Sequence, residues 1–155
     1  MPDIVLECNP DEALIKVLGY SRKMITHQSS KGEVINYLER NPASIGIVDE
    51  DPGSAKPTYF SKFSLETEER FGIESYKITK LGTRLIVIKP RLEEWILKHA
   101  KELKIDPGKH SLPSNGNELH KIINTRISKF ESMLKVMLDK RSAALGHLKS
   151  LIDSK

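Results

Sequence analysis

The sequence predicts an α/β protein built on a mostly parallel sheet flanked by helices. Three apolar runs without polar alternation, residues 3–7, 45–48 and 83–89, have the composition of buried strands. Segments with apolar residues at helical spacing separate these runs or follow them. Because strands that alternate with helices usually pair in parallel, we expect a sheet with both faces covered.

Local signals define the expected ends of the first two helices. Asn9 is a preferred N-cap and Gly19 is typical of a helix end, so a helix is predicted between them. Ser29 and Ser30 can cap a second helix, which we expect to continue to Arg40. A weak strand is expected between the two helices.

The middle of the chain is expected to contain a long irregular segment and then a pair of strands. Residues 52–75 carry Gly, Pro, Ser and scattered acids, which predict a long loop or insert. Residues 76–81 and 83–89 predict two strands on either side of Gly82. Pro90 is expected to open the next helix.

The C-terminal third of the chain is predicted to be helical. Apolar residues recur at helical spacing from Leu119 to Ile152, with a break expected near residues 139–142. We therefore expect an α/β domain over residues 1–105 and a helical extension over residues 106–155 that packs on it. The apolar stripe of this extension also offers a surface for homodimerisation.

The charges are divided unevenly along the chain. Residues 1–75 hold 8 Lys and Arg against 13 Asp and Glu, giving −5, whereas residues 76–155 hold 17 against 8, giving +9. An acidic half beside a basic half suits a protein that holds a cation and approaches a polyanion. The single cysteine, Cys8, and the lack of a signal peptide or membrane span predict a cytoplasmic protein.

Carboxylates follow two of the predicted strands. Asp49 and Asp51 stand at positions i and i+2, which point the same way in an extended chain, and Glu7 ends the first strand. Ligands of open α/β sheets bind beyond the carboxyl ends of the strands. If the two strands are neighbours, three mutually repelling carboxylates meet at one edge and favour a cation there. Oxygen ligands without nearby His or Cys favour Mg²⁺ or Mn²⁺.

These acids resemble the pattern of the TOPRIM domain, the metal-binding module of topoisomerases, primases, repair proteins and OLD-type nucleases. The pattern consists of Glu7 at a strand end, Asp11 in the following helix, and Asp49 and Asp51 after a later strand. The resemblance implies a TOPRIM-like, Rossmann-like fold in which these four acids bind metal. Asp11 lies in the first turn of a helix, where a purely electrostatic role is equally open. Cys8 stands where many TOPRIM domains carry glycine.

A second segment strengthens the resemblance. VIKPRLEEWI, residues 87–96, is similar to the strand–turn–helix segment of stand-alone and OLD-like TOPRIM proteins. It implies that Glu93 is a further metal ligand, with Glu94 as the alternative register. Lys89 and Arg91 could stabilise a phosphoryl transition state or hold a phosphate, or they could equally neutralise the carboxylates.

Two functions remain open at this point. The resemblance covers roughly residues 3–100 and implies a Mg²⁺- or Mn²⁺-dependent nuclease, acting on DNA or RNA, in defence against phage or plasmids. Glu7, Lys89 and Arg91 would be its catalytic residues. The alternative is a non-catalytic TOPRIM-like module that binds or regulates a partner protein, an ATPase or a nucleic acid. A receiver-like domain also ends strands in acids, but the pair Glu7-Cys8 fits it poorly. None of these functions involves a membrane.

Overall fold

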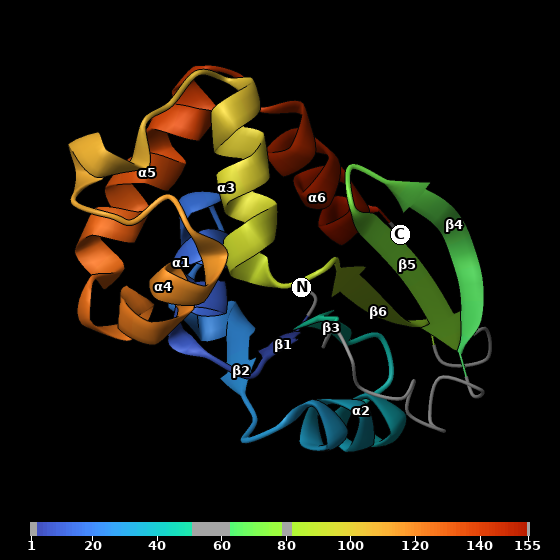
Figure 1. Ribbon diagram of the computed structural model, residues 1–155. Helices are drawn as coiled ribbons and strands as arrows, with labels where there is room; N and C mark the ends of the chain where they lie inside the picture. Colours follow the sequence, from blue (N-terminus) through green and yellow to red (C-terminus); the bar gives the residue numbers. More distant parts are fainter. Residues whose placement is uncertain (1–2, 51–62, 79–81, 155) are drawn as a thin grey trace. The chain divides into compact units, whose positions relative to one another are not determined.

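The computed structural model of this protein describes residues 3–50, 63–78 and 82–154 of the 155-residue chain (Figure 1). The described residues form helices and one six-stranded sheet, which confirms the predicted α/β class. Residues 52–62, which belong to the expected long loop, lie outside the described residues, as does Asp51.

The chain divides into two compact units. The first combines Met1–Cys8 with Ser21–Arg91 and contains the sheet. The second combines Asn9–Tyr20 with Leu92–Lys155 and is helical. We expected a division near residue 105, whereas each unit is made of two stretches that are separated in the sequence.

The sheet has the strand order β2-β1-β3-β6-β5-β4. Its strands are β1 (Ile4–Leu6), β2 (Ile25–His27), β3 (Ile45–Asp49), β4 (Ser64–Arg70), β5 (Ile73–Ile78) and β6 (Thr83–Ile88). The first four strands in the spatial order pair in parallel, β5 is antiparallel to β6, and β4 is antiparallel to β5. This mixed, mostly parallel sheet is compatible with a Rossmann-like fold.

Strand β4 corrects the sequence prediction of a loop over residues 52–75. Residues 64–70 form this strand at one edge of the sheet, where β5 is its neighbour among the described strands (Figure 1). Every residue of SLETEER is exposed, and Leu65 is its one large apolar residue. The strand therefore lacks the apolar alternation by which half-buried strands are found in a sequence.

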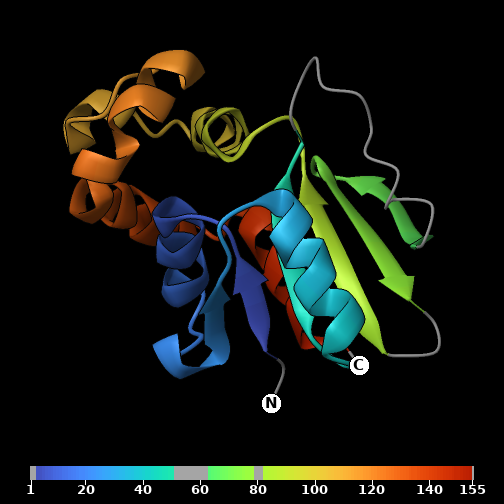
Figure 2. The same ribbon diagram turned by 90° about the horizontal axis from the view of Figure 1, so that it is seen from below.

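Helix α2 (Lys31–Arg40) covers part of the sheet within the first unit (Figure 2). The Ser30 side chain caps it by accepting a hydrogen bond of 3.2 Å from the backbone N–H of Glu33, as the sequence predicts. Its buried residues Val34 and Leu38 face Gly46 of β3. A Cβ atom at Gly46 would lie 2.7 Å from Leu38 Cδ1, so the close approach of helix and strand requires glycine there.

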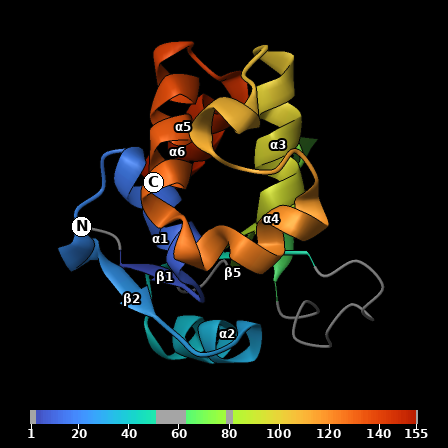
Figure 3. The same ribbon diagram turned by 60° about the vertical axis from the view of Figure 1, so that its left-hand side comes forward.

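The helical unit is built from five α-helices (Figure 3). They are α1 (Asn9–Val17), α3 (Leu92–Glu102), α4 (Gly116–Ile122), α5 (Ile127–Asp139) and α6 (Ala143–Asp153). Helix α1 packs against α5, and α3 packs against α4. The four buried residues of α5 recur at helical spacing, and they are Phe130, Met133, Leu134 and Met137. In the described part of the chain, no helix combines the length and hydropathy that a membrane crossing requires.

The ends of these helices follow local signals. Helix α3 begins two residues after Pro90, which is preceded by a cis peptide bond from Lys89. The expected break near residues 139–142 is confirmed, because α5 ends at Asp139 and Arg141 adopts a left-handed conformation with φ of 59°. Ser142 then caps α6 by accepting a hydrogen bond of 3.3 Å from the backbone N–H of Leu145.

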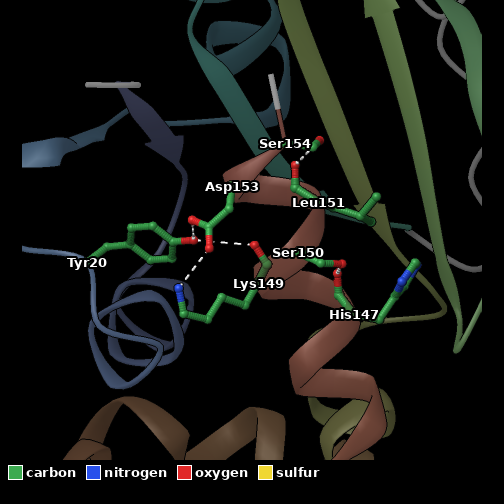
Figure 4. Close-up of polar contacts among 7 residues, drawn as sticks. All are labelled: Tyr20, His147, Lys149, Ser150, Leu151, Asp153 and Ser154. Carbon is green, nitrogen blue, oxygen red and sulfur yellow. Dashed lines mark hydrogen bonds and ion pairs between the residues drawn. The ribbon is translucent and has the colours of Figure 1, made fainter.

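A polar cluster holds the end of α6 to the segment that follows α1 (Figure 4). The Tyr20 hydroxyl donates a hydrogen bond to one carboxylate oxygen of Asp153. Lys149 Nζ donates to the other oxygen at 2.8 Å and lies 5.1 Å from the centre of the Tyr20 ring. These contacts lower the pKa of the Asp153 carboxyl, the hydrogen bond from Lys149 more than that from Tyr20, and burial partly opposes the change.

Candidate functional site

Glu7 and Asp49 lie at the same edge of the sheet. Strands β1 and β3 are parallel neighbours with Ile4 opposite Ile45, so their carboxyl ends meet at one edge. Asp49 is the last residue of β3, and Glu7 directly follows β1. Both side chains are partly exposed. The condition that the two strands be neighbours is therefore met, and the pairing provides two carboxylates where ligands of open α/β sheets bind.

The third acid of the predicted cluster, Asp51, lies outside the described residues. Within residues 3–50, 63–78 and 82–154, no three His, Cys, Asp or Glu side chains are grouped in a way that could hold a metal ion. The described residues therefore supply Glu7 and Asp49 as oxygen donors at the sheet edge. The three-acid metal site remains a prediction.

Strand β6 brings Lys89 to the edge that carries Asp49. Asp49 stands opposite Ile88 in the parallel pairing of β3 and β6, and the backbone N–H of Glu50 donates to the Ile88 carbonyl at 2.8 Å. Lys89 directly follows Ile88 and is anchored by a hydrogen bond of 2.8 Å from its backbone N–H to the Gly72 carbonyl. The carboxyl ends of three parallel strands thus contribute side chains to this edge.

The Lys89 ammonium is held between two carboxylates. Its Nζ lies 3.4 Å from a carboxylate oxygen of Glu50 and forms a closer ion pair with Glu74. The hydrogen bond to Glu74 is the main cause that raises the pKa of Lys89, and burial partly opposes it. Of the two roles predicted for Lys89, these contacts favour neutralisation of carboxylates. Its acceptors are Glu50 and Glu74, however, and not the predicted metal ligands.

Glu74 was not predicted as a site residue. It lies on β5 opposite Val87 of β6, in an antiparallel pairing that connects it to the parallel part of the sheet. Glu74 falls within residues 52–75, whose composition predicts a loop, so no sequence pattern marks this position. The pairing of β5 with β6, and not the spacing of Glu74 along the chain, brings it to Lys89.

Arg91 is the last residue of the first unit and lies three positions after the end of β6. Its side chain is partly exposed. It therefore lies beyond the carboxyl end of β6, as Glu7 lies beyond that of β1. Its predicted contact with a phosphate remains a prediction.

Asp11 and Glu93 belong to the helical unit. Asp11 is buried in the first turn of α1, where the helix dipole stabilises an acid. Glu93 is buried in the first turn of α3, and one of its oxygens lies 3.2 Å from His120 Nδ1 of α4. Its other oxygen, Oε2, is buried without a hydrogen-bond partner among the described residues. Metal binding by either acid remains a prediction.

The partners of the acid pair in α3 were not found from the sequence. His120 is 27 positions from Glu93 and meets it only because α3 packs against α4. Glu94, the alternative register, lies close to Gly116 at the start of α4, where a Cβ atom would be 2.7 Å from the Glu94 side chain. Glu93 is the more buried of the two acids and is oriented towards α4 within its own unit.

Comparison with known proteins found no match. The chain matches no protein-family model, and no curated protein or solved structure is significantly similar to it. The resemblance to the TOPRIM domain therefore rests on the residues of this chain alone.

Proposed function

We propose that this protein is a Mg²⁺- or Mn²⁺-dependent enzyme that acts on phosphodiester bonds of a nucleic acid, as a nuclease. The observation that carries the proposal is the parallel pairing of β1 with β3, which brings the ends of both strands to one edge. Glu7 and Asp49 stand at these ends. Carboxylates from two neighbouring strands at one edge are costly in electrostatic energy, and such placement is typical of functional sites.

The donors present fit a hard divalent cation. Glu7 and Asp49 offer carboxylate oxygens, and Asp51 follows Asp49 by two positions in the sequence. Mg²⁺ and Mn²⁺ prefer such oxygen ligands. A bound ion would neutralise charge on the phosphate during reaction.

The remaining chemistry belongs to side chains at this edge. Glu7 would take a proton from the attacking group or return one to the leaving group. Arg91 would hold the phosphate by charge-assisted hydrogen bonds. Lys89 would act indirectly, because its ion pairs with Glu50 and Glu74 reduce the negative charge that a polyanion meets at this edge.

Cleavage assays test the proposal. Labelled DNA and RNA are incubated with Mg²⁺ or Mn²⁺ and with wild-type protein or the Glu7→Gln, Asp49→Asn or Glu68→Gln variant. Loss of Glu7 is expected to slow cleavage about 10²- to 10⁴-fold, as for loss of a general acid or base. Glu68 is an exposed acid on β4 and serves as the matched control, which should cleave at the wild-type rate. Cleavage that survives both site substitutions would reject the proposal.

The second candidate is a non-catalytic module that binds or regulates a partner. One observation favours it: Lys89, a predicted catalytic residue, is held in ion pairs with Glu50 and Glu74. In that case wild-type protein would bind nucleic acid or a partner protein, and neither metal would give cleavage. Titration calorimetry in the presence of Mn²⁺ separates the candidates further. The module would still bind its nucleic acid or partner protein when Asp49 is replaced by Asn.

A further inference from the structure

The helical unit exposes basic side chains from the end of α4 through α5. Four cations are exposed on it, namely Lys121, Arg126, Lys129 and Lys135. The other exposed side chains between Leu119 and Leu138 are His120, Asn124, Thr125, Ser128 and Ser132. No Asp or Glu between Leu119 and Leu138 is exposed, and the exposed acids Glu118 and Asp139 flank this stretch. We call the four cations with the other exposed side chains between Leu119 and Leu138 the α4–α5 basic face.

The lysines of this face have no carboxylate partner in the part of the chain that the structure describes. They are Lys121, Lys129 and Lys135. Glu131 lies one helical turn before Lys135 but is half-buried and does not pair with it. In the same unit, by contrast, Lys149 is paired with Asp153 at 2.8 Å. The positive charge of the face is therefore available to an external anion.

Arg126 is partly ordered by the fold. Its Nη1 donates a hydrogen bond to the Ser111 carbonyl, which uses one of the five N–H groups of the guanidinium. The side chain remains exposed, so the other donors face solvent. A guanidinium oriented in this way loses less conformational entropy when it binds a phosphate.

We propose that the α4–α5 basic face binds the phosphate backbone of a double-stranded nucleic acid. Charge complementarity is the reason, because a duplex carries one negative charge per about 1.7 Å of its axis.

The composition of the face argues against two other anionic partners. A helix that lies on an anionic bilayer exposes a broad apolar side, whereas the apolar residues of α5 are buried, and the one exposed large apolar residue in the described ranges is Leu65 of β4. Single-stranded nucleic acid is held largely by stacking on aromatic side chains. The nearest aromatic residue, Phe130, is fully buried.

This proposal goes beyond the nuclease proposal and does not depend on it. The face belongs to the helical unit, whereas Glu7 and Asp49 belong to the sheet unit. Binding can therefore be measured in EDTA, in which a Mg²⁺- or Mn²⁺-dependent nuclease is inactive. Loss of binding and loss of cleavage are then separate results.

The experiment measures binding of fluorescently labelled 20-base-pair DNA and RNA duplexes to the full chain by anisotropy, in EDTA and from 50 to 200 mM KCl. Each phosphate contact contributes about −0.9 to the slope of log K against log salt, so four cations give up to about −3.6. The Lys129→Gln/Lys135→Gln variant should reduce this slope by about 2. At 0.1 M salt it should weaken binding on the order of 50-fold.

Two variants make the result specific to the face. Lys98→Gln/Lys101→Gln removes the same charge from exposed positions of α3 in the same unit, and it should bind duplex nearly as wild type does. Lys129→Arg/Lys135→Arg keeps the charge and should retain binding. Circular dichroism confirms that each variant is folded.

Three results would overturn the proposal. The first is no duplex binding by wild-type protein at 50 mM KCl. The second is equal weakening by the α3 control, which would mean that net charge alone determines binding. The third is preferential binding, lost in the Lys129→Gln/Lys135→Gln variant, to phosphatidylserine vesicles or to single-stranded oligonucleotides of matched length.

Discussion

Lys89 joins Glu50 to Glu74 at the carboxyl end of β6, so a residue of β5 and a residue that follows β3 share one cation. This bridge links the antiparallel part of the sheet to its parallel part. Glu50, the middle of three consecutive acids in the sequence, is thereby paired with Lys89.

Replacing Lys89 by Met should destabilise the protein by about 1 kcal/mol at pH 7, since the pair is partly buried and partly screened. The pKa of Lys89 is raised in the folded state. The contribution of Lys89 to the free energy of unfolding is therefore fully present below the ordinary lysine pKa of 10.5. It is lost as the pH rises through the pKa of Lys89 in the folded protein. Urea unfolding of both proteins at pH 7 and above pH 10.5 checks this.

The control for that experiment is Lys77→Met, which removes an exposed lysine from the same hairpin. We expect its unfolding free energy to stay within about 0.5 kcal/mol of wild type. A deficit for Lys89→Met that persists unchanged above the ordinary pKa would show that lost packing, and not the ion pairs, is responsible.

Replacing Gly46 by Ala should destabilise the first unit by about 1–3 kcal/mol, as overpacking of a core does. The added methyl group would lie 2.7 Å from Leu38 Cδ1 and 3.1 Å from Val34 Cγ1. Gly32→Ala is the matched control in the first turn of α2, where a Cβ atom would meet only Ser30 Oγ at 3.8 Å. It should leave stability unchanged or raise it by up to about 1 kcal/mol. Equal effects of the two substitutions in thermal unfolding would contradict the packing of α2 on β3.

Replacing Asp153 by Asn should lower stability slightly at pH 7, by up to about 0.5 kcal/mol, because its pair with Lys149 is half exposed and screened by solvent. The pKa of Asp153 is lowered in the folded state. The contribution of Asp153 to the free energy of unfolding is therefore present above the ordinary pKa of 3.8. It is lost as the pH falls through the pKa of Asp153 in the folded protein. Asp139→Asn is the control at the last residue of α5. The stability difference between wild type and Asp153→Asn should close in acid. A difference that is the same at pH 7 and pH 3 would rule out the charge as its cause.

The elements with strong local signals could be predicted from the sequence. The helix after Ser30 and the strand that ends at Asp49 have caps, breakers or unbroken apolar runs. Strand β4 could not be predicted, because an exposed edge strand such as SLETEER is held by its neighbour and not by an apolar pattern. The grouping of α1 with the C-terminal helices is also non-local, since it arises from packing of α1 on α5.

The candidate site, like the fold, could be predicted only in part from the sequence. The neighbourhood of Glu7 and Asp49 follows from the rule that parallel strands present their carboxyl ends at one edge. The acceptor Glu74 and the pair of Glu93 with His120 could not be found, because pairing across strands or between helices brings them together. The sequence therefore locates the ends of β1, β3 and β6 well, but not the start of β5 at Ile73, the strand β4 or the side-chain partners.

In the proposed enzyme, Glu7 and Asp49 share one divalent cation. Anomalous diffraction from a crystal soaked in Mn²⁺, measured at the manganese absorption edge, would locate this ion. We predict one anomalous peak that lies about 2.0–2.6 Å from carboxylate oxygens of both residues. A peak bound elsewhere, or carboxylates of residues 7 and 49 more than about 10 Å apart with no ion between them, would contradict the account.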